Sequence, residues 1–319
     1  MPDIQSNINK ELAFVFPGQG SQSVAMLDEL GARHREVAAT FEEASDVVGR
    51  DLWKLSREGA PEDLAQTEIT QPLMLAGGVA VWRVWTQTSG QKPGVMAGHS
   101  LGEYSALVAA GALRYVDAVQ LVADRARLMQ QAVPAGTGAM AAILGLDDEI
   151  VEAICREMAE KQVVAAANYN SPGQLVIAGH AAAVERAMTA CLDAGARRAM
   201  KLPVSVPSHC ALMGPAALEF AELVKGVDLA APSIPVLHNV DVRARDDVES
   251  IRTALVEQLS APVRWTATVR EMVAMGVEML AECGPGRVLS GLGRRIDKSA
   301  QWFPMDSEAG LAKLQKAMD

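Results

Sequence analysis

A Gly-x-Ser-x-Gly pentapeptide at residues 98–102 holds the serine best suited to act as a nucleophile. A short apolar run, 94–97, precedes Ser100, and an alanine-rich helical pattern, 103–110, follows it. Strand, serine and helix in this order are typical of a nucleophile elbow, where flanking glycines avoid clashes at a strained turn. The Leu101 amide would then face negative charge forming on a substrate oxygen, as half of an oxyanion hole. Chance occurrence of common residues is the alternative explanation.

The second candidate functional residue is an arginine, Arg125, on the apolar face of a predicted helix. The pattern predicts a helix over 115–133 with one apolar and one polar arc, at about 100° per residue. Arg125 falls in the apolar arc, whereas Arg127 lies on the polar side. A buried guanidinium is costly unless a negative group meets it. Arg125 would have a purely structural role if it paired with an internal carboxylate, or if its own side chain extended far enough for the charged end to reach solvent. A nucleophile nearby favours a ligand carboxylate instead.

The candidate base lies on a proline-stiffened loop, 202–210. His209 comes late in the chain relative to the serine, which suits an elbow nucleophile. No acid stands out as the third member of a triad, because Asp228 and Asp241 lack distinguishing context. A main-chain carbonyl could orient the imidazole instead, and Gln258, in the apolar helix before Pro262, is a candidate neighbour.

Two further loops could approach a substrate. The apolar run 12–16 predicts a buried parallel strand, and it ends in the glycine-containing loop 17–22. Amides in that loop, near Gln19, could face an anion, although an ordinary strand-to-helix turn has the same residues. The segment 168–173 has the composition of a turn between two strands. A substrate-facing role for Asn170 is a secondary possibility.

Composition restricts the class of protein. The chain has 319 residues, of which 50% are hydrophobic, and a net charge of −10, which suits a soluble globular protein with a large core. The scattered basic residues do not indicate a nucleic-acid partner. The four cysteines are far apart and the histidines are not clustered, which predicts reduced cytosolic thiols and no metal site. Residues 1–10 are polar and are expected to form a frayed N-terminal extension rather than a signal peptide.

No apolar run reaches membrane-spanning length. We therefore expect a cytoplasmic protein with no membrane partner. As separate expectations, it has no bound cofactor and is a monomer.

The elements that must position these residues alternate between strand and helix up to the serine. Polar helical patterns occupy 33–66 and an apolar helix is predicted over 72–85. This alternation favours a parallel sheet covered by helices, with the nucleophile at the carboxyl edge of a strand. An apolar strand at 276–281 and a turn into a helix at 282–289 complete the larger domain.

Between these parts the chain changes character. From 139 to 202 the order is strand, helix, strand, strand, helix, strand, which is the order of a ferredoxin-like unit. The predicted class is α/β: a hydrolase-like parallel-sheet domain of residues 11–134 and 206–319, with a ferredoxin-like insert of residues 135–205. No internal repeat or long linker suggests independent modules.

Five motifs in order resemble the bacterial malonyl-CoA:acyl carrier protein transacylase family. The resemblance covers residues 11 to about 296, and its motifs are Phe14-Val-Phe-Pro-Gly-Gln-Gly-Ser-Gln22, Gly98-His-Ser-Leu-Gly-Glu-Tyr104, Asn168-Tyr-Asn-Ser-Pro-Gly-Gln174, Val204-Ser-Val-Pro-Ser-His209 and Gly284-Pro-Gly286. Five ordered motifs are far more specific than the elbow alone.

The resemblance implies an enzyme and assigns its residues. Ser100 is expected to be the nucleophile, His209 the base and Arg125 the group that binds the malonyl carboxylate. The amides of Gln19 and Leu101 are expected to hold the oxyanion, and a carbonyl oxygen near Gln258 to orient the histidine. Malonyl-CoA is the implied donor substrate. The phosphopantetheine thiol of acyl carrier protein is the implied acceptor, for fatty acid synthesis.

Three other functions remain open from the sequence. A serine hydrolase of esterase type would share the elbow, but we would expect it to have an acidic triad member and no arginine for a carboxylate. A non-catalytic docking protein would not depend on Ser100. The third open function is the same acyl transfer in polyketide synthesis, to a different carrier protein. Two small basic groups, residues 197–201 and residues 294–295, could bind an acidic carrier.

Overall fold

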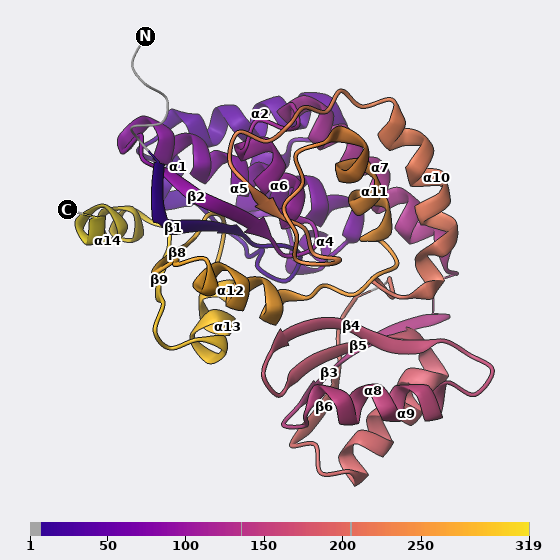
Figure 1. Ribbon diagram of the computed structural model, residues 1–319. Coiled ribbons are helices and arrows are strands. Elements are labelled where there is room, and N and C mark those ends of the chain that lie inside the picture. Colours follow the sequence, from indigo (N-terminus) through magenta and orange to yellow (C-terminus); the bar gives the residue numbers. More distant parts are fainter. Residues whose placement is uncertain (1–7, 135, 205, 319) are drawn as a thin grey trace.

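A parallel sheet of five strands forms the centre of the larger domain in this computed structural model, which describes residues 8–134, 136–204 and 206–318. The strands are β1 (Ile8–Phe16), β2 (Lys92–Gly98), β7 (Val236–Leu237), β8 (Met279–Glu282) and β9 (Gln301–Pro304). Their order across the sheet is β7-β2-β1-β8-β9, and all neighbouring pairs are parallel (Figure 1). The predicted parallel α/β architecture is confirmed.

Both faces of this sheet are buried. Along β1, Leu12, Phe14 and Phe16 enter one hydrophobic cluster, while Ala13 and Val15 enter another. Successive strand residues point to opposite faces, so a strand covered on both sides is apolar throughout. Helices α5 (Thr67–Thr88) and α6 (Gly102–Ala109) supply the first cluster. Helices α12 (Trp265–Ala274) and α13 (Val288–Ile296) supply the second.

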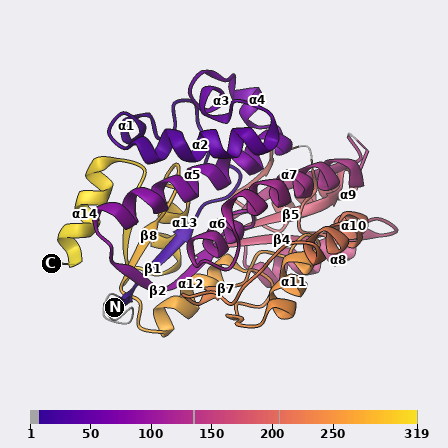
Figure 2. The same ribbon diagram turned by 90° about the horizontal axis from the view of Figure 1, so that it is seen from above.

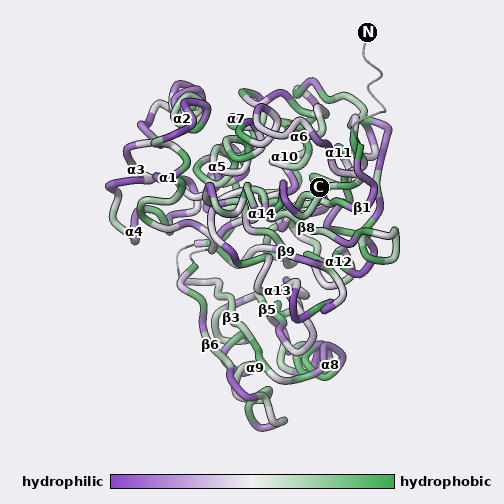
Figure 3. Tube along the Cα trace, turned by 90° about the vertical axis from the view of Figure 1, so that its left-hand side faces the viewer, coloured by the Kyte–Doolittle hydropathy of each residue, from purple (hydrophilic) through white to green (hydrophobic). Residues whose placement is uncertain are grey.

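Further helices surround this centre (Figure 2). They are α1 (Asp28–Gly31), α2 (Arg35–Val48), α3 (Leu52–Glu58), α4 (Pro61–Leu64), α7 (Tyr115–Ala132), the short 3₁₀ turn Ala211–Met213, α10 (Gly214–Lys225), α11 (Val248–Glu257) and α14 (Glu308–Met318). Helix α2 buries Val37, Phe41 and Ala44, which recur at helical spacing on one face. Figure 3 accordingly shows α2 with both hydrophilic and hydrophobic residues.

The inserted unit has an antiparallel sheet of its own. Its elements are β3 (Gly138–Leu144), α8 (Asp148–Ala159), β4 (Val164–Ser171), β5 (Gln174–His180), α9 (Ala181–Asp193) and β6 (Arg198–Lys201). The strand order is β4-β5-β3-β6, with every pair antiparallel, and α8 and α9 pack on the sheet around a separate hydrophobic cluster. This is the predicted ferredoxin-like arrangement, and Figure 1 shows it beside the larger domain. Residues 135 and 205 lie outside the described residues, so the exact limits of the insert stay a prediction.

Three predicted elements differ from the structure. Residues 8–10, expected in a frayed extension, begin β1, because main-chain pairing with β2 does not require apolar side chains; residues 1–7 lie outside the described residues. Helix α5 begins at Thr67 and contains Pro72 in its second turn, so the helix continues through a residue that has no N–H to donate to the carbonyl four residues earlier. Most of the predicted turn 168–173 belongs to β4, since only Pro172 and Gly173 separate it from β5.

The end of the chain also completes the sheet. Strand β9 pairs with β8 and α14 packs on β9, so the residues after 296 belong to the same domain. None of the helices among the described residues has both the length and the apolar character needed to cross a membrane.

Candidate active site

The serine sits on a sharp turn between β2 and α6. Ser100 has a φ of 50°, in the left-handed region that non-glycine residues rarely adopt. A Cβ atom added to Gly98 would lie 1.8 Å from the carbonyl carbon of Gly102, and one added to Gly102 would lie 2.0 Å from the oxygen of Phe16. Because these neighbours are main-chain atoms that cannot move aside, both positions require glycine. The strand-turn-helix geometry predicted for the elbow is therefore present.

An asparagine far away in the sequence holds this turn. The main-chain N–H of Ser100 donates to Oδ1 of Asn239 over 2.7 Å, and Nδ2 of Asn239 donates to the carbonyl of Gly98 over 2.6 Å. Asn239 is buried, and its side-chain amide offers both an acceptor and a donor. It thereby pairs the Ser100 N–H and the Gly98 carbonyl, two main-chain groups that the sharp turn would otherwise leave unpaired.

The loop histidine reaches the serine. Nε2 of His209 lies 2.7 Å from Oγ of Ser100, and Nδ1 lies 2.8 Å from the carbonyl oxygen of Gln258. A carbonyl only accepts hydrogen bonds, so Nδ1 carries the proton and Nε2 is left to accept the serine proton. The Gln258 carbonyl thus lies where a triad acid would be expected, and its role in orienting His209 stays a prediction.

The environment of His209 keeps its imidazole neutral. Burial, together with the nearby Arg125 charge, lowers the pKa of His209 to about 3. A neutral imidazole with its free nitrogen facing the serine can accept a proton at physiological pH.

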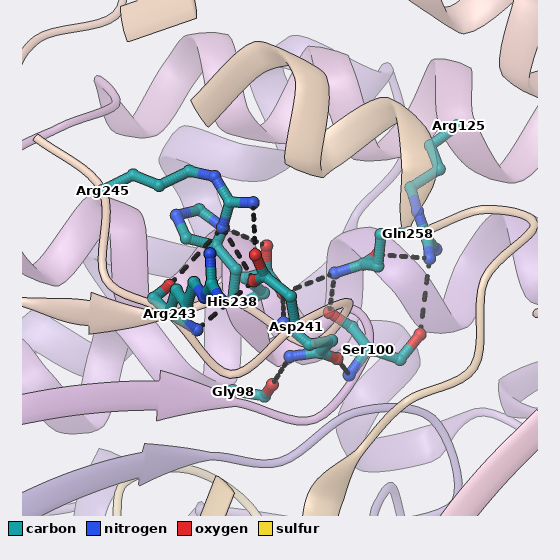
Figure 4. Close-up of polar contacts among 10 residues, drawn as sticks. Gly98, Ser100, Arg125, His238, Asp241, Arg243, Arg245 and Gln258 are labelled. Atoms are coloured by element: carbon teal, nitrogen blue, oxygen red, sulfur yellow. Dashed lines mark hydrogen bonds and ion pairs between the residues drawn. The ribbon is translucent and has the colours of Figure 1, made fainter. Parts of the chain in front are cut away.

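Neither candidate acid lies at the histidine. Figure 4 shows Asp241 beside Arg245, with which it forms an ion pair of 2.9 Å. Asp228 lines a surface groove between α7 and α10. Of the remaining histidines, His34 pairs with Glu308, and His238 is buried against Glu103. No grouping of metal-ligating side chains occurs among the described residues.

Arg125 points at the serine from the buried face of α7. Its side chain is 1% exposed, and its NH2 group lies 3.3 Å from Oγ of Ser100. It donates also to Oε1 of Gln71 over 2.7 Å and to Oε1 of Gln258 over 2.9 Å, and Figure 4 shows Arg125, Gln258 and Ser100 converging. No carboxylate pairs with Arg125 in the part of the chain that the structure describes. An internal acid in direct contact with Arg125 is therefore not found there, and the buried Glu103 acts on Arg125 only at longer range.

One expected oxyanion donor, the Leu101 amide, lies within the elbow, and the other, the Gln19 amide, lies on the loop packed against it. Gln19 lines the same cavity as Ser100, and Leu101 is the first residue after the serine. The loop of Gln19 packs tightly on the elbow, since a Cβ on Gly18 would lie 2.4 Å from the oxygen of His99. Within the described residues, neither main-chain N–H of Gln19 and Leu101 has an acceptor. Two free amides near one hydroxyl match the requirement for an oxyanion hole, and their role stays a prediction.

A cavity of about 160 Å³ opens over the serine between the two domains. The larger domain contributes Gln19, His99, Ser100 and His209, and the insert contributes polar and apolar side chains. The insert residues are Met140, Asn168, Asn170, Val176, Leu202 and Val204. Ser100 and His209 therefore face a pocket whose opposite wall belongs to the insert.

Asn170 lies on that opposite wall. Its Oδ1 is 2.8 Å from Nε2 of His99, so it links the insert to the elbow. Burial lowers the pKa of His99, which keeps this ring neutral. The structure brings Asn170 into the cavity as expected, and a contact with substrate stays a prediction.

Sequence reasoning missed three buried polar residues of the site. Gln71 binds Arg125, Asn239 binds the Ser100 amide, and Glu103 accepts hydrogen bonds from both Asn239 and Gln258. The available signal was a polar residue in an apolar segment. Gln71 begins the apolar stretch of α5, and Glu103 lies within the alanine-rich α6. A polar residue in an otherwise apolar segment must find a partner when it is buried.

The chain is similar to known proteins in both sequence and structure. Residues 13–316 match the family model described as the acyl transferase domain. The malonyl CoA-acyl carrier protein transacylase of Salmonella typhimurium is 57% identical over 302 residues, covering 95% of this chain and 98% of that protein. The protein of the same name from Bacillus subtilis is 43% identical, covering 90% and 91%.

Two solved structures extend this similarity to the fold. The malonyl CoA-acyl carrier protein transacylase from Coxiella burnetii has a TM-score of 0.95 at 47% identity, and the match covers 96% of this chain and 97% of that one. A malonyl-transacylase solved in complex with a type II PKS acyl-carrier protein has a TM-score of 0.95 at 52% identity, covering 97% and 100%. The match to the family model extends beyond residue 296, where the predicted resemblance ends.

Proposed function

This chain belongs to the acyl transferase family, and from that premise we propose that it transfers a malonyl group from malonyl-CoA to the phosphopantetheine thiol of acyl carrier protein. The enzyme thereby supplies chain-extender units for fatty acid synthesis. The observation that carries the proposal is the 2.7 Å contact between Oγ of Ser100 and Nε2 of His209, with Arg125 beside it.

The first half of the reaction forms an ester on Ser100. His209 takes the hydroxyl proton, and the serine oxygen attacks the thioester carbon of malonyl-CoA. The Gln19 and Leu101 amides hold the negative oxygen of the tetrahedral intermediate, each contributing about 3 kcal/mol by comparison with other acyl-transfer sites. Collapse breaks the carbon–sulfur bond, and His209 returns the proton to the departing coenzyme A thiolate.

The second half runs the same steps with a different thiol. His209 removes the proton from the phosphopantetheine thiol of the carrier protein, and the sulfur attacks the malonyl ester. When the intermediate collapses, the carbon–oxygen bond to Ser100 breaks and the serine regains its proton from His209. No metal or bound cofactor is needed for this chemistry.

Arg125 supplies the preference for malonyl over acetyl groups. The malonyl carboxylate can accept hydrogen bonds from the guanidinium at the point where it contacts Oγ of Ser100. An acetyl group offers no such acceptor and leaves the buried cation without a negative partner, which costs about 1.5–3 kcal/mol for each lost hydrogen bond.

Asn170 is proposed to contact the substrate from the insert wall. Both substrates carry a pantetheine arm with amide groups, and Asn170 offers a side-chain amide at the cavity lining. The carrier protein itself would approach through one of two basic surfaces, residues 197–201 or Arg294 with Arg295, because acyl carrier proteins are acidic.

A second candidate is transfer to a polyketide carrier protein. The observation that favours it is the 52% identity to a malonyl-transacylase solved with a type II PKS acyl-carrier protein. Comparing transfer rates to a fatty acid carrier and to a polyketide carrier separates the two.

We also propose where and in what state the enzyme works. Its four cysteines are free and buried, which fits a reducing compartment such as the cytoplasm. A single chain contains the nucleophile, the base and the arginine, so the proposed reaction can proceed in a monomer. Neither nucleic acid nor a membrane takes part in it.

Intact-protein mass spectrometry tests the proposal. After mixing with malonyl-CoA, the protein should gain the mass of one malonyl group and lose it again when holo-acyl carrier protein is added. Ser100→Ala should gain nothing. Rapid turnover of simple esters without a stable acyl form would support a hydrolase instead, and malonylation of Ser100→Ala would exclude this serine.

A further inference from the structure

Glu103 is a fully buried acid that none of the steps above uses. It lies in the first turn of α6, three residues after the serine, and its side chain is 0% exposed. Three donors reach its two oxygens: Nδ1 of His238 at 2.8 Å, the main-chain N–H of Asn239 at 2.9 Å and Nε2 of Gln258 at 2.9 Å. A carboxylate so placed is an acceptor for every one of them.

The hydrogen bond between Glu103 and Gln258 determines the orientation of the Gln258 side-chain amide. The two ends of a glutamine amide are nearly the same size, so hydrogen-bond partners determine which end points where. Glu103 and the Ser100 carbonyl both accept, and both lie at Nε2 of Gln258, at 2.9 and 3.1 Å. The oxygen end of the amide must therefore point the other way.

At that other end lies Arg125. Its NH2 group donates to Oε1 of Gln258 over 2.9 Å and to Oγ of Ser100 over 3.3 Å. If the Gln258 amide turned round, two donors would face each other in a buried site, and the guanidinium would have to move away from the serine. The position of Arg125 beside the reacting oxygen thus depends on an acceptor that does not touch Arg125.

We propose that Glu103 is a positioning residue for malonyl selectivity: it fixes the Gln258 amide, and the amide in turn holds Arg125 at the serine. This inference rests on the proposed function, since selectivity is defined for the acyl group that Ser100 receives. In this role Glu103 has no contact with substrate, and Gln258 connects it to Arg125.

The test compares malonyl and acetyl groups in each variant. Initial rates of Ser100 acylation by malonyl-CoA and by acetyl-CoA are measured by rapid quench and intact mass, and their ratio is the readout. In Glu103→Gln the ratio should fall by about 10- to 100-fold, the range expected for one hydrogen bond to a charged group. A general loss of folding would lower both rates and leave the ratio unchanged.

A matched control is available in Glu282. It is also a fully buried glutamate, and its oxygens accept from the main-chain N–H groups of Leu289 and Ser290 at 2.9 and 2.7 Å. Glu282→Gln changes a buried carboxylate in the same way without touching Gln258. Its malonyl-to-acetyl ratio should stay within about twofold of the unaltered protein, since Glu282 shares no hydrogen-bond partner with Gln258 or Arg125 among the described residues.

A second variant keeps the inference testable if Glu103→Gln does not fold. Gln258→Met removes both ends of the amide while its main-chain carbonyl still orients His209, and it should lower the ratio in the same way. In the Gln258→Met background, Glu103→Gln should cause no further drop, because the intermediary is gone.

The outcomes separate this inference from the proposed function. An unaltered protein that accepts no malonyl group overturns the function itself. A malonylated protein whose ratio is unchanged or raised in folded Glu103→Gln, or in Gln258→Met, overturns the role of Glu103 and leaves the function standing. Additive losses in the double variant would also overturn it, since they would mean that Glu103 acts by another route.

Discussion

The partners of the buried Arg125 side chain are two glutamine amide oxygens and the Ser100 hydroxyl. Gln71 and Gln258 accept hydrogen bonds from the guanidinium without neutralising its charge, and its Nε has no partner among the described residues. A glutamate in either place would occupy Arg125 and compete with the substrate carboxylate. The free protein therefore keeps a buried cation 3.3 Å from Oγ of Ser100, where we propose that it binds the substrate carboxylate.

Arg125→Ala should abolish the preference for malonyl groups. The lost hydrogen bonds to the malonyl carboxylate amount to about 1.5–3 kcal/mol each, so the malonyl rate should fall at least about tenfold while the acetyl rate changes much less. Acylation rates with the two CoA esters measure this. Arg127→Ala is the matched control, because Arg127 lies two residues along the same helix and pairs with Asp124 on the surface. An unchanged preference in Arg125→Ala would remove Arg125 from substrate recognition.

The pH dependence of acylation should reflect the depressed pKa of His209. Its ordinary value is 6.5, and burial with the Arg125 charge lowers it to about 3, so the base is already neutral at pH 5. The value of kcat/KM for malonyl-CoA should then stay nearly level from about pH 5 to 7. A fall in kcat/KM with a midpoint near 6.5, in protein whose circular dichroism is unchanged, would contradict the buried neutral imidazole.

The same shift has a consequence for stability with a definite sign. Between pH 6.5 and about 3 the unfolded chain protonates His209 whereas the folded chain does not. The unfolded state binds more protons in this range, so His209 makes the free energy of unfolding fall as the pH is lowered.

At the scale of elements, the elbow is a junction where three main-chain segments approach too closely for side chains. Gly18, Gly98 and Gly102 each face main-chain atoms within 2.4 Å of a hypothetical Cβ. The loop after β1 and the turn after β2 are packed together because β1 and β2 are adjacent parallel strands whose carboxyl ends meet at one sheet edge. Gln19 and Leu101 come together for this reason.

Gly102→Ala should destabilise the protein and lower acylation. The added methyl would lie 2.0 Å from the oxygen of Phe16, so β1 or the start of α6 must move, at a cost of at least about 1–3 kcal/mol. Urea denaturation and the acylation rate measure the two effects. The control is Gly291→Ala in α13, where a Cβ meets nothing within 4 Å and alanine favours the helix. Equal stability of the two variants would contradict the close packing described here.

At the scale of the whole molecule, the insert is joined to the larger domain along β4. The main-chain N–H of Tyr169 donates to the oxygen of Val263 over 2.9 Å, and the N–H of Val263 donates to the oxygen of Ala167 over 2.8 Å. The side-chain contact of Asn170 with His99 continues this seam to the elbow. The cavity is therefore formed by two domains whose relative position is held by hydrogen bonds next to the serine.

Asn170→Ala should weaken substrate binding more than turnover. It removes the partner of a buried imidazole nitrogen, at a cost of about 1–3 kcal/mol, and it removes an amide from the cavity wall. KM for malonyl-CoA should rise several-fold while kcat changes less. Gln174→Ala, which breaks the surface contact with Arg295, is the control and should change neither. If Asn170→Ala left KM unaltered, Asn170 would be no part of the substrate site.

Much of the fold could be read from local sequence patterns. The apolar residues 12–16, the Gly-x-Ser-x-Gly turn and the strand-helix order of residues 139–202 all predicted elements that the structure contains. Such patterns are informative because they depend on side chains only a few residues apart. The starts of β1 and α5 were missed because main-chain pairing and helix extension continue without the apolar pattern that marks them.

The sequence by itself also pointed to Ser100, His209 and Arg125, since each has an unusual setting: a glycine-flanked turn, a proline-stiffened loop and an apolar helix face. Only the tertiary structure decided what surrounds them. Gln71 lies 54 positions from Arg125 and Asn239 lies 139 positions from Ser100, yet both are within hydrogen-bond distance. Such partners leave no local trace, because a hydrogen bond requires closeness in space, and the packing of the whole chain determines which distant residues meet.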